Sequence, residues 1–76
     1  MMRNELFHME RNLLEVGDSV EIVEGVLANA YYYTVIPSIA MSMNYELGNR
    51  ILSTNGTVIK KTREGSTYCL IIEFEN

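Results

Sequence analysis

The chain has 76 residues, with 10 acidic side chains against 6 basic ones and a formal net charge of -4. This length excludes a nucleotide-binding α/β fold, a barrel enzyme and two independent domains, and it predicts a single domain over residues 1–76. A chain this short buries about 60% of its unfolded surface, so its core is small and often needs help from an oligomer, a metal or a disulfide.

The cysteine content and the first residues bear on the compartment. Cys69 is the single cysteine, which excludes a disulfide within the chain. The opening segment mixes charged and apolar residues and lacks the apolar core of a signal peptide. Both observations favour a reducing environment, so we expect a cytoplasmic protein.

Charge is concentrated in the first third of the chain. Residues 1–24 hold six acidic and two basic side chains, a balance of -4, whereas residues 25–45 hold no charged side chain. This uncharged run is compatible with a membrane helix, with two buried segments joined at Pro37, or with an apolar surface for a partner. Its asparagines, its proline and its acidic flanks argue against the membrane helix, and we expect no membrane partner.

The first segment has the spacing of a helix. Apolar side chains recur at helical intervals between Leu6 and Val16, and Asn4 is a candidate N-cap. The sequence therefore predicts an amphipathic helix over residues 4–15, which Gly17-Asp18 ends.

The middle of the chain predicts two strands and an ambiguous segment. A short strand over residues 20–23 ends at Gly25, and the tyrosine-rich residues 30–36 predict a second strand that Pro37 closes. Residues 38–48 fit either an alternating strand or a helix. Alanine and two methionines after a proline favour a short helix over residues 38–47.

The last third predicts two hairpins. Asn55-Gly56 suits a type I′ turn between residues 51–54 and 57–60. A second hairpin is expected at Glu64-Gly65-Ser66, followed by a strand over residues 67–74. One face of that strand carries Tyr68, Leu70, Ile72 and Phe74.

These elements predict a mostly-β fold, a small five-stranded barrel over residues 18–75 behind the N-terminal helix, because closure removes the exposed edges of a meander. Leu14–Ile22 resembles the opening of small bacterial SH3-like barrel proteins, where a Gly-Asp turn leads into the first strand. Asn55–Ile59 and Tyr68–Phe74 are similar to their closing strands. The Gly-Asp and Gly-Thr-Val elements also resemble those of KOW-type barrels.

The resemblance implies a fold and carries no activity with it. The chain lacks the tryptophan and the Ala-Leu-Tyr-Asp-Tyr segment of peptide-binding SH3 domains, and it is acidic where KOW-type barrels are usually basic.

Side chains for catalysis or metal binding are few. A nucleophilic pair would have to use Cys69 and His8, each of which is better explained as a packing residue. One cysteine and one histidine cannot supply four zinc ligands. An acidic enzyme site at Glu21 or Glu73 would require a pocket with a perturbed carboxylate. The five glycines stand singly, as turn residues do, and form no phosphate-binding loop. The sequence predicts no catalytic residue, metal or cofactor.

We instead expect a non-enzymatic interaction module that binds protein, either a second copy in a homodimer or a larger partner. In a strand, Tyr31 and Tyr33 point opposite to Tyr32, so the three rings cannot share one small core. Tyrosine and methionine are enriched at interfaces. The expected contact residues are Tyr31, Tyr33, Ile39, Met41, Met43 and Tyr45. The competing explanation is that the N-terminal helix covers this face.

A basic cluster gives the alternative function. The cluster could attract phosphates and offers a stacking ring, the minimum for single-stranded nucleic acid, and its residues are Arg50, Lys60, Lys61, Arg63 and Tyr68. Glu64 offsets part of its charge, and lysines that protect a strand edge explain it at least as well. Nucleic acid is therefore the less expected partner. Salt sensitivity separates the two functions, because phosphate contacts weaken steeply with salt.

Overall fold

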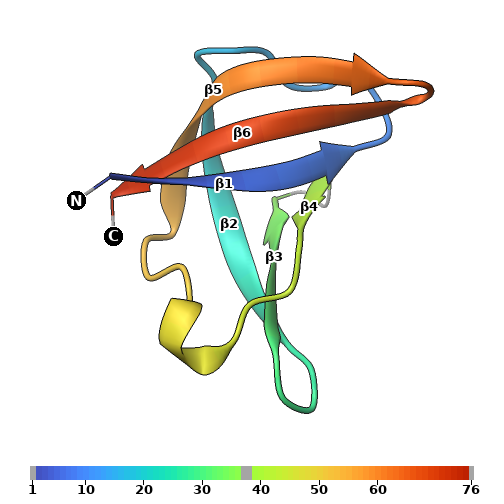
Figure 1. Ribbon diagram of the computed structural model, residues 1–76. Helices are drawn as coiled ribbons and strands as arrows, with labels where there is room; N and C mark the ends of the chain where they lie inside the picture. Colours follow the sequence, from blue (N-terminus) through green and yellow to red (C-terminus); the bar gives the residue numbers. More distant parts are fainter. Residues whose placement is uncertain (1, 37–38, 76) are drawn as a thin grey trace.

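Residues 2–36 and 39–75 are described by a computed structural model, in which six antiparallel strands close into a barrel (Figure 1). Their order around the barrel is β1-β4-β3-β2-β5-β6. The elements are β1 (Met2–Met9), β2 (Ser19–Val26), β3 (Tyr31–Val35), β4 (Ala40–Ser42), the 3₁₀ turn η1 (Leu47–Asn49), β5 (Asn55–Glu64) and β6 (Thr67–Glu75). The predicted mostly-β barrel is confirmed, with six strands in place of five. This closed architecture is compatible with SH3-like and OB-like barrels.

The predicted N-terminal helix is wrong, because β1 occupies its first half. Phe7 and Met9 are fully buried and His8 between them is exposed, which is the two-residue period of a strand. Leu13 and Val16, which completed the helical spacing, are largely exposed. β1 pairs with β6 along its whole length, so the backbone ladder outweighs the local helical pattern.

The core fills the barrel interior and is built from alternate residues of the strands. The predicted inward face of β6 is confirmed, since Leu70, Ile72 and Phe74 are fully buried and Tyr68 packs against the core. The Phe7 and Phe74 rings lie 6.0 Å apart between β1 and β6. The largest fully buried side chains are Tyr33, Phe7, Phe74, Met9, Leu70, Ile72, Val35 and Val58.

The helix predicted around residues 38–47 is wrong within the described residues, because Ala40–Ser42 form β4 and the 3₁₀ turn η1 begins only at Leu47. Ala40 is buried, Met41 is exposed and Ser42 is half-buried, so the alternating interpretation of this segment is the correct one. β4 fits between β1 and β3, through the pairs Phe7↔Ser42 and Val35↔Ala40. The positions of Pro37 and Ser38, the proposed strand end and helix cap, lie outside the described residues.

The two glycine signals of the C-terminal third have opposite outcomes. Gly65, at a φ of 61°, forms the expected tight turn between β5 and β6. The hairpin predicted at Asn55-Gly56 is wrong, because both residues begin β5 and Gly56 pairs with Phe74. A Cβ at Gly56 would lie 2.6 Å from Cε1 of Phe74, so glycine is required here for close packing and not for a turn.

The two predicted middle strands exist as β2 and β3. β2 is longer than predicted, since it continues through Gly25 to Val26. The Tyr32 ring covers Gly25, where a Cβ would lie 2.2 Å from Cζ of that ring. No helix among the described residues is long and apolar enough to cross a membrane.

Candidate functional site

A polar network closes one end of the barrel, around the hydroxyl of Tyr33. This buried hydroxyl donates a hydrogen bond of 2.8 Å to Oε2 of Glu24 and accepts one of 2.8 Å from the backbone N–H of Ile51. Arg50 binds the same carboxylate through both oxygens, with Nε at 2.9 Å and Nη2 at 2.7 Å. The Arg50 guanidinium also lies 4.7 Å from the centroid of the Tyr31 ring. The network therefore ties β2 and β3 to the chain that follows η1.

A second set of contacts continues the network across the barrel end. Arg3 of β1 forms an ion pair with Glu5 and donates to the carbonyl oxygens of Asn49 and Arg50. Tyr45 donates a hydrogen bond of 2.8 Å from its hydroxyl to Oε1 of Glu5. The rings of Tyr45 and Tyr33 lie 5.8 Å apart. Together these contacts hold residues 43–51 over the opening of the barrel.

The network shifts the pKa of its members in the directions expected of a structural cluster. The hydrogen bonds from Arg50 lower the pKa of the Glu24 carboxyl, against the opposing effect of burial. Burial, assisted by the bond to Glu24, raises the pKa of Tyr33. Burial and the bond to Glu5 likewise raise the pKa of Tyr45. These shifts keep the Glu24 carboxylate ionised and the two tyrosine hydroxyls protonated, the states in which each makes its hydrogen bonds.

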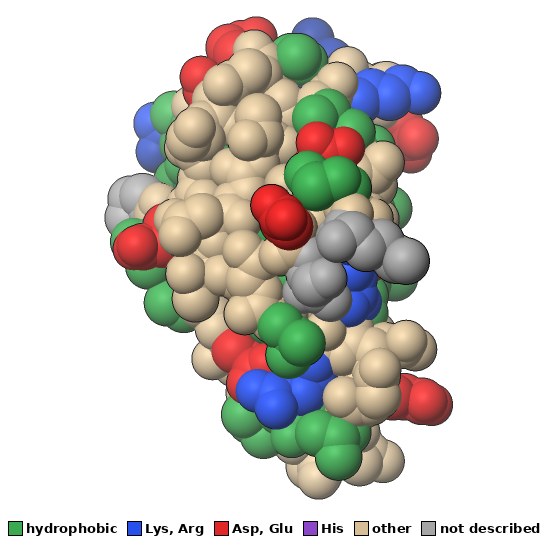
Figure 2. Space-filling model, turned by 90° about the vertical axis from the view of Figure 1, so that its left-hand side faces the viewer, with side chains coloured by type: hydrophobic (Ala, Val, Ile, Leu, Met, Phe, Trp, Pro, Cys, Tyr) green, Lys and Arg blue, Asp and Glu red, His purple; other side chains and the backbone are tan. Residues whose placement is uncertain are grey.

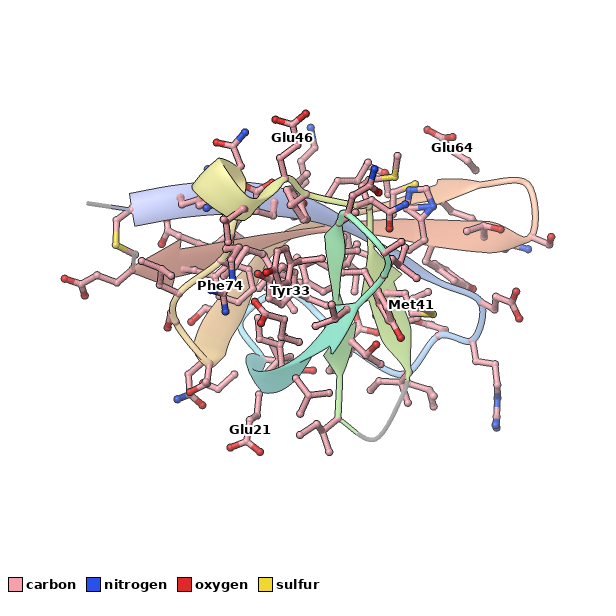
Figure 3. The ribbon with its side chains drawn as sticks, turned by 90° about the horizontal axis from the view of Figure 1, so that it is seen from below. Glu21, Tyr33, Met41, Glu46, Glu64 and Phe74 are labelled. Carbon is pink, nitrogen blue, oxygen red and sulfur yellow. The ribbon has the colours of Figure 1, made fainter. Side chains whose placement is uncertain are left out.

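The tyrosines of the predicted contact surface accordingly lie in or against the core. Tyr33 is 1% exposed, and Tyr31 and Tyr45 are half-buried and pack against the core. Figure 3 shows Tyr33 in the interior, on the same side of the strands as Phe74. The argument that Tyr32 must point away from its neighbours holds, because Tyr32 pairs with Gly25 on the outside of the barrel. The outward face of β3 is therefore the one that carries Tyr32, whereas the predicted contact residues Tyr31 and Tyr33 lie on its inward face.

Apolar side chains gather on this outward face, over β2, β3 and β4. The register aligns Val23, Thr34 and Met41 in one row across the three strands. Ile36 lies two residues after Thr34, on the same outward side, and its N–H donates to the carbonyl oxygen of Glu21. Val23 and Met41 are each 50% exposed and Ile36 is 44% exposed. We call the set of Val23, Tyr32, Thr34, Ile36 and Met41 the β4 face.

A groove borders the β4 face on the side of β1. It has a volume of about 640 Å³ and is lined by His8, Glu10, Arg11, Leu13, Ile39, Ala40, Met41 and Thr67. Ile39 and Met41 of the predicted surface thus lie side by side at this groove. Met43, just past β4, is 55% exposed. Of the predicted contact residues, the structure therefore brings Ile39 and Met41 together at the groove, and neither Met43 nor the three tyrosines line it.

The predicted nucleic-acid cluster is divided and partly neutralised. Arg50 lies in the network at the barrel end, and Lys61 forms an ion pair of 2.7 Å with Glu15 and donates to Asn12. Lys61 Nζ lies 5.3 Å and Arg63 Cζ 5.7 Å from the centroid of the half-buried Tyr68 ring. The ring that would stack on a base is therefore already covered by two cations of the chain.

The residues weighed for catalysis are placed as packing or surface residues. His8 and Cys69 are direct neighbours on the outside of β1 and β6. Glu21 projects away from the barrel (Figure 3), and Glu73 is half-buried on β6. Within residues 2–36 and 39–75, no three His, Cys, Asp or Glu side chains are grouped as metal ligands would be. A recess of about 220 Å³ beside Glu24 and Tyr33 holds neither Glu21 nor Glu73.

The face of the barrel that carries the chain ends differs from the β4 face. In Figure 2, hydrophobic side chains are scattered there between polar side chains and backbone.

Comparison of the chain with protein-family models, curated proteins and solved structures found no match.

Sequence reasoning missed the ionic part of the network. Glu24 and Arg50 are 26 residues apart, and Arg3 reaches carbonyls 46 and 47 residues away. A local signal exists only for Arg3 and Glu5, because the two-residue period of a strand places them on the same inward side of β1 as Phe7 and Met9. That alternation was hidden by the competing helical spacing.

Proposed function

We propose that this protein is a non-enzymatic binding module that associates with a second copy of itself through the β4 face. One observation carries the proposal, namely that exposed apolar side chains of β2, of β4 and of the residue that follows β3 gather on one outward face of the barrel. Val23 and Met41 lie at the two ends of a row whose middle residue is the half-buried Thr34, and Ile36 follows the end of β3. Val23, Ile36 and Met41 each leave 44–50% of their surface exposed to solvent. Exposed apolar residues that are contiguous point to a contact surface more than scattered ones do.

The distribution of charge permits a second copy as the occupant. The chain has a net charge of -4, so two copies repel unless they meet at a neutral surface. Among the outward residues of β2, β3 and β4 that the structure describes, Glu21 is the one charged side chain. Its side chain projects away from the barrel (Figure 3), beside Ile36, whose N–H bonds to its carbonyl oxygen, and it can stay hydrated at the rim of a contact.

The size of the protein is compatible with such a contact. A standard interface takes about 800 Å² from each partner. This is about one sixth of the accessible surface of 4888 Å² and corresponds to one face of the barrel. The groove beside Met41 adds Ile39 and Leu13 to the apolar surface that a partner can reach.

The test is the mass in solution of the wild type and two variants, measured by light scattering over a dilution series. We expect a concentration-dependent dimer that resists high salt, because apolar contacts do not weaken with salt. Met41→Glu should dissociate it, since it places a carboxylate in both copies of the β4 face. Leu47→Glu is the matched control, because Leu47 is 66% exposed on η1, outside the β4 face.

A wild type that is monomeric throughout the series would overturn self-association. A dimer that survives Met41→Glu but dissociates in Leu47→Glu would assign the contact to η1 instead. Loss of the dimer at high salt would show a charged contact and would also contradict the proposal.

A further inference from the structure

The second half of β5 is a strand edge with one neighbour. β5 pairs with β2 only from Asn55 to Thr57, and Val58 then bonds to Asp18 and Gly17. The register with β6 shifts between Val58 and Lys60, as at a β-bulge, and beyond this point β6 is the only strand paired with β5. Bulges often end pairing in this way. In Figure 1 this part of β5 forms the upper border of the sheet.

The hairpin register determines which backbone groups face the open side. Glu64 and Thr67 flank the two-residue turn, and the pair at this position of a hairpin is hydrogen-bonded. Because the pattern alternates, Thr62 and Lys60 also direct their backbone groups toward β6. Lys61 and Arg63 therefore direct an N–H and a C=O each toward the open edge, in position to pair with a further strand.

The charges along this edge select the partner. Lys60 and Arg63 are exposed and supply the available positive charge, whereas Lys61 between them is already paired with Glu15 and Glu64 ends the strand. In an antiparallel pairing of two copies centred on Thr62, Lys61 would face the other copy's Arg63, and like charges opposite each other are destabilising. An acidic segment would instead find Lys60 on one face of the added strand and Arg63 on the other.

A nucleic acid fits the same charges less well. Its bases would need a free ring, but the Tyr68 ring lies under Lys61 and Arg63. The backbone of the edge alternates donors and acceptors as an extended peptide does, whereas phosphate oxygens can match only its donors.

We propose that the edge of β5 from Lys60 to Glu64 binds an acidic, extended segment of a partner protein as an additional strand. This inference does not depend on the β4 face, which lies on other strands. Met41→Glu should leave peptide binding unchanged, so the two proposals can fail separately.

The experiment uses the full chain and a short synthetic peptide in which glutamate alternates with valine. Addition of the peptide should protect the amides of Lys61 and Arg63 from hydrogen exchange and shift their NMR signals. Lys60→Glu should weaken binding by about tenfold, because it places a carboxylate opposite the glutamates. Arg11→Glu, which reverses an exposed charge in the loop after β1, should have little effect.

Two further ligands decide between strand addition and simple charge attraction. The same peptide with N-methyl groups on alternate backbone nitrogens keeps its charge but cannot complete the ladder, so it should not bind. Equal binding of the methylated peptide would overturn the proposal, as would an equal effect of Arg11→Glu. Tighter binding of a single-stranded oligonucleotide that shifts the Tyr68 signals would assign the edge to nucleic acid.

Discussion

The hydroxyl of Tyr33 is the group on which the barrel end depends most, and removing it tests the network. Tyr33→Phe leaves the ring in place but deprives the buried N–H of Ile51 of its acceptor and the Glu24 carboxylate of a donor. A buried donor without a partner costs about 1–3 kcal/mol, and Glu24 keeps its two bonds from Arg50. We therefore expect a loss of about 2 kcal/mol from the free energy of unfolding.

The loss is measurable because the whole domain is only marginally stable. A chain of this length is expected to have about 4–11 kcal/mol of stability. A loss of about 2 kcal/mol lowers the melting temperature by about 8–16 °C, and urea unfolding gives the free energy itself. Tyr32→Phe is the matched control on the outward side of β3, where we expect less than about 0.5 kcal/mol. An equally small loss for Tyr33→Phe would refute the account of this network.

Two other predictions address packing and pH. Gly56→Ala should destabilise the barrel by about 1–3 kcal/mol in urea unfolding, because its Cβ would lie 2.6 Å from Phe74 and 2.7 Å from Ile72. Gly48→Ala is the control, because a Cβ there would have nothing within 4 Å. Similar losses of stability at both glycines would contradict the packing argument. The pKa of Glu24 is lower in the folded chain than its ordinary value of 4.5, so its stabilisation is present above that pH and is lost as the pH falls through the folded value. Glu24→Gln should therefore be less stable than the wild type at neutral pH, and the difference in urea midpoint should shrink in acid; a difference that grows in acid would show that the pKa shift has the opposite sign.

The architecture could be predicted from the strands that alternate cleanly. In β6 the inward side chains Leu70, Ile72 and Phe74 and the turn at Gly65 each have a local cause, and the structure places them as expected. β1 was missed because its apolar residues fit two periods, and only its partner β6 selects between them. Asn55-Gly56 was misread because a glycine that favours a turn is also the one residue that fits beneath Phe74.

The candidate surfaces depended on information that the sequence holds only in part. The alternation of three tyrosines predicts that one face is left over, but it does not say which face turns inward. Tyr33 turns inward because its hydroxyl bonds to Glu24 of β2. Tyr45 likewise bonds to Glu5 of β1, so in both cases the partner lies in another strand. The basic cluster shows the same limit, since Glu15 and Tyr68 reach Lys61 only in the folded barrel.

The most direct test of the central claim is an intermolecular NOE experiment on a mixed sample. One copy carries labelled methionine methyl groups, and the other is unlabelled. We expect NOEs from the partner copy to the methyl group of Met41, on the β4 face, and none to Met2, which is exposed at the other end of β1. Absence of any intermolecular NOE at concentrations suited to NMR, or NOEs confined to Met2, would contradict the claim that the β4 face is the contact surface.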